Sequence, residues 1–218
     1  MLASMEKVLR LDVKEKNKKM NRLNNQNINT SEYWNKTFES EIKRNRFRVE
    51  IERFERTMTM IEDNTDVIDI GCGRGEFVEY LLKYKKQCRV LGIDFSKTAI
   101  EDAKKRIHNA RFADIDVYKL ADYSSLLKKH DYAVCFEVIE HLDRPDILIN
   151  NIYEILKPNG YLILSTPYDN MVFGGDEHVF SFSFKDMCNF FENNKWNIIT
   201  LTRYQRKFSN MFVLVQKI

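Results

Sequence analysis

Two carboxylates and a histidine with the spacing of one helical turn are the first candidates for chemistry in this sequence. They are Glu137, Glu140 and His141, at positions i, i+3 and i+4, so a helical turn would bring all three side chains to one side. Such a group could bind a divalent cation, or His141 could act as a general base beside Glu140. The structural alternative is that Glu137 positions a cofactor, Glu140 is solvated and His141 packs against the turn.

Three of the seven glycines in the 218-residue chain lie in a second candidate site, the window Gly71-Cys72-Gly73-Arg74-Gly75. The window follows a short apolar run and precedes an amphipathic segment, which is typical of a turn from a strand into a helix. A helix N-terminus presents unpaired N–H groups and a partial positive charge, and glycine lets a ligand approach the backbone closely. We therefore expect this loop to bind a ligand.

Two acidic residues, one after the glycine window and one at the end of the next strand, indicate what kind of ligand the loop binds. Glu76 stands where the dinucleotide-binding fingerprint has its third glycine, and a carboxylate there would repel a pyrophosphate while tolerating an ammonium or sulfonium group. Asp94 follows Gly75 by 19 residues at the end of a predicted strand, where an acid accepts both hydroxyl groups of a ribose. The structural alternative for Asp94 is a helix N-cap, for which Ser96 is the better candidate. These residues predict a nucleoside ligand without phosphates.

Short β-branched runs alternate with amphipathic segments in the rest of the chain, which is typical of βαβ units and a parallel sheet. Asn159-Gly160 predicts the end of a helix before the fifth strand, and Ser183 with Asp186 predicts the capped start of the last helix. Only seven residues separate the last two strands, too few for a crossover helix, so these strands should form an antiparallel hairpin. The strands are expected at 66–70, 89–94, 111–115, 131–136, 160–165, 197–203 and 211–216.

The N-terminal part differs from the rest in charge and in pattern. The formal net charge is +3, and residues 1–60 hold 14 Lys or Arg against 9 Asp or Glu while the remainder holds 21 against 23. We expect residues 1–30 to be flexible or loosely helical, residues 31–62 to form helices that cap a substrate, and residues 63–218 to form the main domain. The basic segment could touch anionic lipid or nucleic acid, but the interleaved Glu residues favour a solvated helical extension.

Composition excludes several classes of protein. So few Gly, Pro and Cys residues rule out collagen-like, low-complexity and disulfide-scaffold chains. Four cysteines without metal-ligand spacing, and without a preceding secretory signal, favour a cytoplasmic location. The sequence contains no uncharged run long enough to span a membrane, and it leaves the oligomeric state open.

Residues 67–75 together with Gly92-Ile93-Asp94 resemble motif I and the following acidic motif of class I S-adenosylmethionine (SAM)-dependent methyltransferases, and the resemblance covers about residues 64–218. It implies a Rossmann-like three-layer α/β sandwich whose seven-stranded sheet has five parallel strands and the antiparallel hairpin. The residues implied to bind SAM are Gly71, Cys72 and Gly73 at the methionine part, Asp94 at the ribose, Phe95 along the adenine, Asp114 with Ile115 at the adenine amino group, and Asp69, Phe136 and Glu137 around the loop. Asp116 competes with Asp114 for its role, and Asp69 could serve only to order the loop.

Residues 137–142, 156–160 and 165–168 resemble a narrower subgroup, the ubiquinone-biosynthesis O-methyltransferases, whose matching residues bind a divalent metal. The small-RNA 3′-terminal 2′-O-methyltransferases share a similar cluster with a further histidine, for which His178 is in a comparable place. The resemblance implies Glu137, Glu140 and His141 as ligands of a cation such as Mg²⁺, and His141, Glu140 and His178 as catalytic groups. His108 and His130 lie in polar segments and are expected to be exposed.

The leading hypothesis is in-line methyl transfer from SAM to the hydroxyl of a small molecule, such as a sugar or a phenolic metabolite, under a lid at 166–184 that contains Gly174-Gly175. Methylation of RNA is a second hypothesis, but the near-neutral main domain argues against a nucleic-acid partner. A nicotinamide-dependent oxidoreductase is a third, disfavoured by Glu76 and by the terminal hairpin. A SAM-binding subunit without catalytic activity is a fourth.

Overall fold

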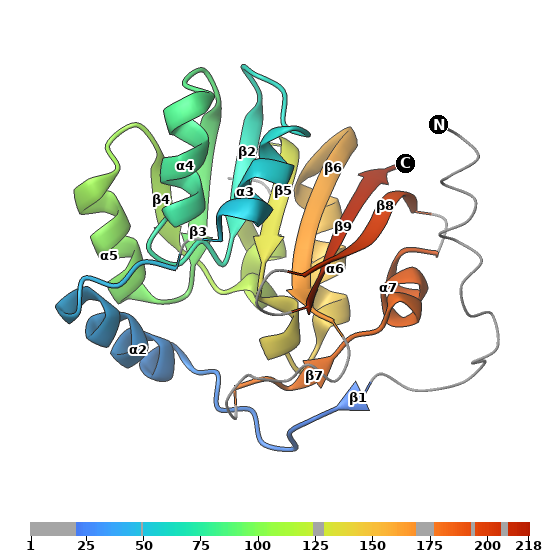
Figure 1. Ribbon diagram of the computed structural model, residues 1–218, viewed down its shortest axis with the longest axis horizontal. Coiled ribbons are helices and arrows are strands. Elements are labelled where there is room, and N and C mark those ends of the chain that lie inside the picture. The colour runs from blue at the N-terminus through green and yellow to red at the C-terminus, as the bar shows by residue number, and fades with distance from the viewer. Residues whose placement is uncertain (1–20, 49, 124–128, 169–176, 193–194, 206–208) are drawn as a thin grey trace.

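A seven-stranded sheet forms the centre of the computed structural model, which describes residues 21–48, 50–123, 129–168, 177–192, 195–205 and 209–218 (Figure 1). The strand order is β4-β3-β2-β5-β6-β9-β8. Strands β2 to β6 are parallel, and β9 runs antiparallel to both β6 and β8, so the predicted hairpin is confirmed. The strands span Asp66–Ile70 (β2), Arg89–Asp94 (β3), Arg111–Asp114 (β4), His130–Phe136 (β5), Leu156–Pro167 (β6), Trp196–Gln205 (β8) and Ser209–Lys217 (β9).

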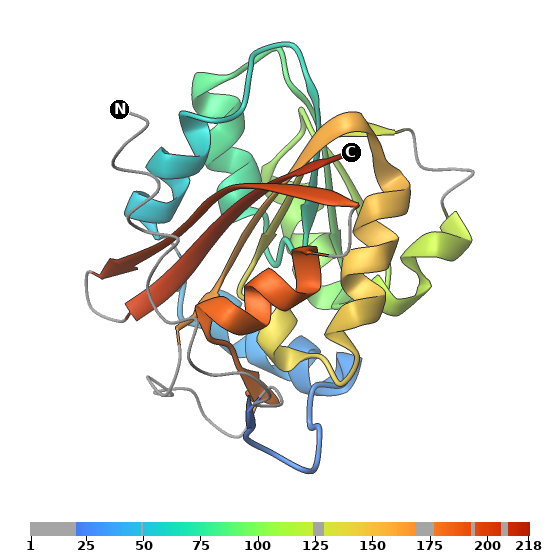
Figure 2. The same ribbon diagram turned by 90° about the vertical axis from the view of Figure 1, so that its right-hand side faces the viewer.

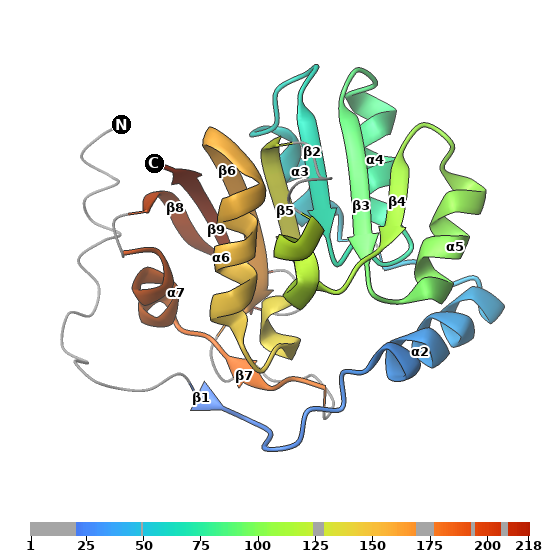
Figure 3. The same cartoon turned by 180° about the vertical axis from the view of Figure 1, so that it is seen from behind.

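Helices cover both faces of the sheet, as expected for a three-layer sandwich (Figures 1 and 3). One face carries α3 (Ile51–Met58), α4 (Glu76–Tyr84) and α5 (Lys97–Arg106), and the other carries η1 (Val117–Tyr123), α6 (Pro145–Ile155) and α7 (Phe184–Phe191). The apolar sides of these helices pack on the strands in two buried clusters, one on each face. Helix α7 begins with the predicted Ser183–Asp186 capping box.

The segment before the sheet lies across the carboxyl ends of the parallel strands. Strand β1 (Asn21–Arg22) pairs antiparallel with β7 (Phe180–Ser181), and α2 (Ser31–Lys43) begins at an N-cap in which the Thr30 hydroxyl accepts a hydrogen bond from a backbone N–H. Figures 1 and 2 show these elements at the same end of the molecule. Residues 21–30 are therefore extended rather than loosely helical as we expected, and residues 1–20 lie outside the described part of the chain.

The Asn159-Gly160 pair lies inside a strand and not at a helix end. Helix α6 ends at Ile155 and β6 begins at Leu156, which pairs with His130. A Cβ on Gly160 would lie 3.0–3.2 Å from three backbone carbonyl oxygens, and Asn159 has a φ of 62°, so this pair accommodates an irregularity in the register of β6.

The expectation that His130 is exposed is wrong. Because β5 begins one residue earlier than predicted, His130 is part of the sheet and is only 2% exposed. His108 is exposed, as expected. None of the helices that the structure describes is both long and apolar enough to cross a membrane.

Candidate functional site

Two adjoining cavities open at the carboxyl ends of the parallel strands. The larger has a volume of about 590 Å³ and the smaller about 160 Å³. Both are lined by Trp34, Gly71, Glu137 and His141, so the two cavities meet at these side chains. The glycine window and the acid–acid–histidine segment, which are far apart in the sequence, therefore belong to one cleft.

The glycine loop has a backbone shape that other residues adopt only with strain. Gly71, Gly73 and Gly75 all have positive φ values, of 70°, 53° and 79°. The N–H groups of Gly71 and Cys72 both donate to the carbonyl oxygen of Ile93 on the neighbouring strand. A Cβ on Gly71 would lie 2.2 Å from Cγ2 of Val138, so side-chain crowding also requires glycine there.

Asp94 joins the glycine loop to the start of the next helix. Its two carboxylate oxygens accept hydrogen bonds from the N–H groups of Gly73 (2.9 Å) and Ser96 (2.8 Å), and burial raises its pKa to about 6 despite these bonds. Ser96 is the N-cap of α5, as the sequence indicated. Asp94 and the half-buried Phe95 line the smaller cavity, which leaves the carboxylate available to a ligand there.

Asp69 is a buried acid without a hydrogen-bond partner on one oxygen. It is 2% exposed, and its Oδ2 has no partner among the described residues. Burial raises its pKa to about 8, with further contributions from the charges of Glu76 and Asp94. Glu76 also lines the larger cavity, where burial raises its pKa although its Oε1 accepts a hydrogen bond from the N–H of Arg48, so two acids at this loop suit a ligand with cationic groups.

The structure places Asp116, and not Asp114, in the smaller cavity. Asp114 is exposed at the end of β4, and neither it nor the buried Ile115 is among the residues that line either cavity. Asp116 and Val117 line it, and the Asp116 carboxylate accepts a hydrogen bond from the N–H of Tyr118. The polypeptide turns away from the sheet after Asp114, which carries the later acid to the cleft.

Glu137 pairs with an arginine from α3 instead of joining the histidines. It has a φ of 53°, and its Oε1 lies 2.8 Å from Nη1 of Arg53 and accepts a hydrogen bond of 2.8 Å from the hydroxyl of Ser165. The Arg53 guanidinium also stacks over the Phe136 ring, 4.9 Å from its centre. The expected group of Glu137, Glu140 and His141 on one face is therefore not what forms, because η2 (Ile139–His141) starts after Glu137 and the left-handed residue turns the carboxylate toward Arg53.

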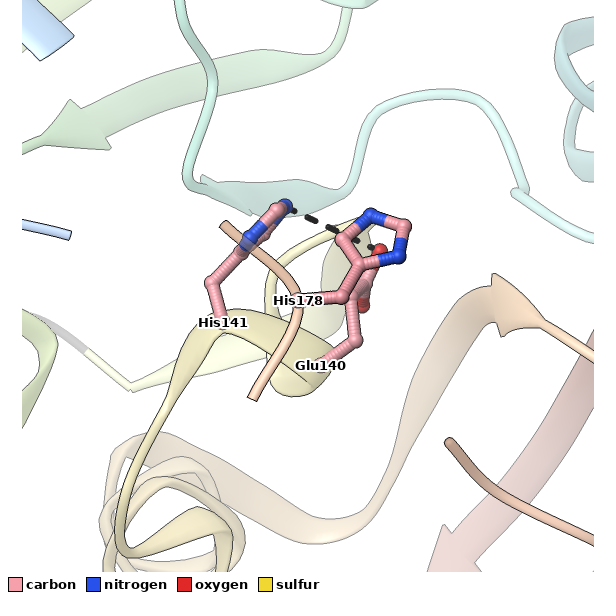
Figure 4. Close-up of side chains that lie close together, drawn as sticks. All are labelled: Glu140, His141 and His178. Atoms are coloured by element: carbon pink, nitrogen blue, oxygen red, sulfur yellow. Dashed lines mark ion pairs between the residues drawn. The ribbon is translucent and has the colours of Figure 1, made fainter. Parts of the chain in front are cut away.

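His178 takes the place that we assigned to Glu137. One ligand atom each from Glu140, His141 and His178 lie within 4.8 Å of one another, and Figure 4 shows the three side chains converging. Oε2 of Glu140 accepts a hydrogen bond from the Thr166 hydroxyl, while Oε1 has no hydrogen-bond partner among the described residues and lies 4.0 Å from Nε2 of His141. Two nitrogen ligands and one oxygen ligand in this arrangement could hold a divalent cation.

Burial dominates the electrostatics of this cluster. Glu140 is 1% exposed, and burial followed by the charge of Glu137 raises its pKa well above the usual value. Burial lowers the pKa of His141 to about 4 and lowers that of His178 as well. Both imidazoles are therefore neutral near pH 7, as a base or a metal ligand requires.

Comparisons with known proteins identify the family. Residues 42–201 match the model of a family described as a methyltransferase domain. The chain belongs to this family. The domain is 33% identical to a malonyl-[acyl-carrier protein] O-methyltransferase of Halalkalibacterium halodurans and 35% identical to the mitochondrial ubiquinone biosynthesis O-methyltransferase of Schizosaccharomyces pombe, in each case over 46% of this chain. The matched part makes up only 38% and 37% of those two relatives.

A likeness among solved structures agrees with the fold of the methyltransferase domain. Magnesium protoporphyrin IX methyltransferase from Synechocystis PCC 6803, solved with bound SAH, superposes with a TM-score of 0.69 at 16% identity, covering 86% of this chain and 97% of that one. The class I methyltransferase fold that the glycine and acidic motifs implied is thereby confirmed.

Sequence reasoning predicted that residues 31–62 cap a substrate, but it did not single out the individual N-terminal side chains that contact the site. Arg53, Asn27 and Asn29 all contact the cleft or its histidines, yet none belongs to a motif. The repeated asparagines of residues 21–29 were the available signal, because short amides at this density are typical of turns and side chain–backbone bonds. Gly174-Gly175 and the rest of residues 169–176, the middle of the expected lid at 166–184, lie outside the described residues.

Proposed function

We propose that this domain transfers the methyl group of SAM to a hydroxyl group of a small molecule. The observation that carries the proposal is the meeting of the two cavities at Gly71, Glu137 and His141. A nucleoside over the glycine loop and Asp94 would end beside the Glu140–His141–His178 cluster. Donor and acceptor would therefore face each other across these residues.

The residues around the smaller cavity fit a SAM donor. Asp94 offers carboxylate oxygens to ribose hydroxyls, Phe95 offers a ring face to the adenine, and Asp116 offers a further acceptor. Gly71 lines this cavity and, having no Cβ, lets Val138 pack against it, and the unpartnered Asp69 oxygen suits a cationic group. When bound, SAM supplies an electrophilic methyl carbon on its sulfonium group.

The residues of the cluster could act as a general base or as the ligands of a divalent cation. His141 is neutral, with Nε2 in the cleft, so it can take the proton that a hydroxyl loses as it is methylated. The unpartnered Oε1 of buried Glu140 is the kind of polar atom that a cation would satisfy, and Glu140, His141 and His178 are the residues that would hold one. A divalent cation there would lower the pKa of a bound hydroxyl.

Methylation of RNA at a 2′-hydroxyl is the second candidate, and the convergence of His178 with Glu140 and His141 favours it. The charge of the larger cavity counts against it. Among the described residues, seven Asp or Glu side chains and three Arg side chains line this cavity, which repels phosphates. A small hydroxyl compound with little negative charge fits this lining better.

Calorimetric titration with SAM, SAH and NAD tests the donor. We expect SAM and SAH to bind in the micromolar range and NAD not to bind, while binding of NAD alone would overturn the proposal. A panel of phenols, sugars and short RNAs, assayed by SAH release with Mg²⁺ or with EDTA, then tests the acceptor and the cation. Turnover of RNA alone would select the second candidate, and turnover unaffected by EDTA would remove the cation.

A further inference from the structure

Residues 21–34, here called the strap, lie against the segment that carries His178. The strap begins with β1, which pairs with β7, and the Leu23 N–H donates to the carbonyl oxygen of Val179 at 2.8 Å. The same segment reaches the cluster from its other side, because the Val179 N–H donates to the carbonyl oxygen of Glu140. The strap and the cluster are thus attached to the same few residues.

Asn27, a residue of the strap, both donates and accepts hydrogen bonds through its side-chain amide. Its Nδ2 donates to the backbone carbonyl of His141 at 3.2 Å and to Oδ2 of Asp143 at 2.8 Å. Its Oδ1 accepts from the N–H and from Nδ2 of Asn29, at 2.9 and 2.7 Å. An amide can donate and accept at once in this way, whereas an ionised carboxylate can only accept.

Asn29 closes a ring of hydrogen bonds around His141. Its Nδ2 also donates to the carbonyl oxygen of Glu177 at 2.7 Å. The same carbonyl lies 2.9 Å from Nδ1 of His141. The ring therefore runs from the His141 backbone through Asn27, Asn29 and Glu177 to the His141 imidazole.

The ring determines which nitrogen of His141 carries the proton. A carbonyl oxygen can only accept, so Nδ1 must be the protonated nitrogen and Nε2 must carry the lone pair. Nε2 is the atom 4.0 Å from Oε1 of Glu140. Trp34 contacts both the imidazole and the hydrogen-bonded asparagines. Its indole packs edge-on against the His141 imidazole with 5.3 Å between the ring centres, and its Nε1 donates to Oδ1 of Asn29.

We propose that Asn27 and Asn29 are positioning residues that hold His141 in the tautomer protonated on Nδ1, with Nε2 directed at the cleft. The inference deepens the proposed function, on which its catalytic meaning rests, because Nε2 can accept a proton or bind a cation only in this tautomer. The strap is then a working part of the cleft, although it precedes the motifs that bind the donor.

The test is ¹⁵N NMR of the histidine-labelled full chain in EDTA at constant pH, with the His141 signals assigned from the H141Q variant. In the unsubstituted protein we expect Nδ1 to show the protonated, pyrrole-type shift and Nε2 the unprotonated, pyridine-type shift. N27D and N29D should each shift this pattern toward a mixture of tautomers, because the new carboxylate cannot donate. Once an acceptor is known, the same variants should lower kcat about tenfold, with KM for SAM changed less than threefold.

Two matched substitutions separate positioning from a general loss of structure. N25D adds the same charge at an exposed asparagine whose side chain makes no hydrogen bond among the described residues. N21D adds the same charge at a strap contact outside the ring, where Asn21 Nδ2 donates to the Ser181 hydroxyl and a carboxylate could instead accept from it. Both should keep the unsubstituted pattern.

A His141 protonated on Nε2, or an unchanged pattern in N27D and N29D, would overturn the inference, as would the same mixture in N21D. If N27D does not fold, N29D and the unsubstituted protein still decide. A protein that gives the expected pattern but binds neither SAM nor SAH would contradict the proposed function and leave the positioning role standing.

Discussion

The two halves of the cleft are built from different kinds of chain segment. The half that we propose binds the donor comes from two adjacent strand ends, with Asp69 to Gly73 at the end of β2 and Asp94 to Ser96 at the end of β3. The cluster half combines the strap, α3, η2 and the segment around His178, four segments that are separated along the chain. The donor half is held by local backbone geometry, and the cluster half by side-chain contacts between distant segments.

This difference determines how each half should respond to substitution. In the donor half, the backbone itself is the binding surface, so added side-chain atoms should abolish binding. In the cluster half, single polar contacts hold the groups in place, so their loss should alter chemistry or stability while donor binding persists. The following predictions test that division.

His141→Ala should have the largest effect on turnover. Removing a general base costs about 10²–10⁴-fold in rate, so we expect about a 10³-fold loss of kcat with the acceptor found in the panel. The affinity for SAH should stay within about threefold, because Asp94 and Asp116 are held by backbone N–H groups and not by the imidazole. The matched control is H108A, at an exposed histidine far from the cleft. A loss of SAH binding as large as the loss of turnover would break the division.

Gly71→Ala should weaken donor binding more than any change in the cluster half. The new Cβ would lie 2.2 Å from Val138 Cγ2 and the φ of 70° disfavours alanine, so we expect SAH affinity to fall about 100-fold. The double variant G71A/V138A relieves the crowding but not the φ strain and should recover part of the affinity. Calorimetry measures both, and an unchanged affinity in G71A would refute a donor site on this loop.

Arg53→Met should lower stability by leaving the Glu137 carboxylate without its partner. Removal of one member of a buried ion pair costs about 3–5 kcal/mol, and because Glu137 is 31% exposed we expect about 2 kcal/mol. The double variant R53M/E137Q should be closer to the unsubstituted protein, which urea unfolding can establish. The single variant E137Q completes the cycle, and a loss of stability in the double variant equal to the sum of the two single losses would mean that the pair is not coupled.

Replacing His130 by Leu should have the smallest effect, a change in how stability depends on pH. His130 contrasts with His141, whose imidazole has a hydrogen-bond partner. Both ring nitrogens of His130 lack hydrogen-bond partners among the described residues, and burial lowers its pKa to about 4 from an ordinary value of 6.5. A lowered folded-state pKa means stability that is present above pH 6.5 and is lost as the pH falls toward 4. Between pH 7.5 and 5.5 the protein should lose about 1.3 kcal/mol more than H130L does.

The difference between the two halves of the cleft also explains how much of the fold and of the site could be predicted from the sequence. The sheet, the closing hairpin and the positions of Gly71 and Asp94 at the cleft could be predicted from short motifs, since a strand and the loop after it fix each other's geometry. Glu137 was misplaced because its left-handed φ breaks the assumed helical turn. Asp114 was preferred to Asp116 because the family resemblance implied it, and the sequence does not show that Asp116 is the acid that reaches the cavity.

The cluster half was harder to predict because its contacts join distant segments. A motif named Glu140, His141 and His178, but no local pattern could show that Asn27 and Asn29 hold one of them. A local pattern also could not show that Arg53 forms an ion pair with Glu137. Helix α3 precedes the glycine loop in the sequence and comes close to the end of β5 only in the folded protein.

The change from parallel to antiparallel pairing between β6 and β9 affects how the substrate specificity of such a domain can change in evolution. Pro167 of β6 and Asn210 of β9 line the larger cavity at the end of the sheet where β8 turns into β9. Residues can be inserted into a hairpin turn without shifting the strands that it connects, and β8 and β9 lie on the far side of β6 from the strands that carry Asp69 and Asp94. Under the proposed function, a change in this one hairpin would therefore alter the acceptor while leaving the residues proposed to bind the donor unchanged.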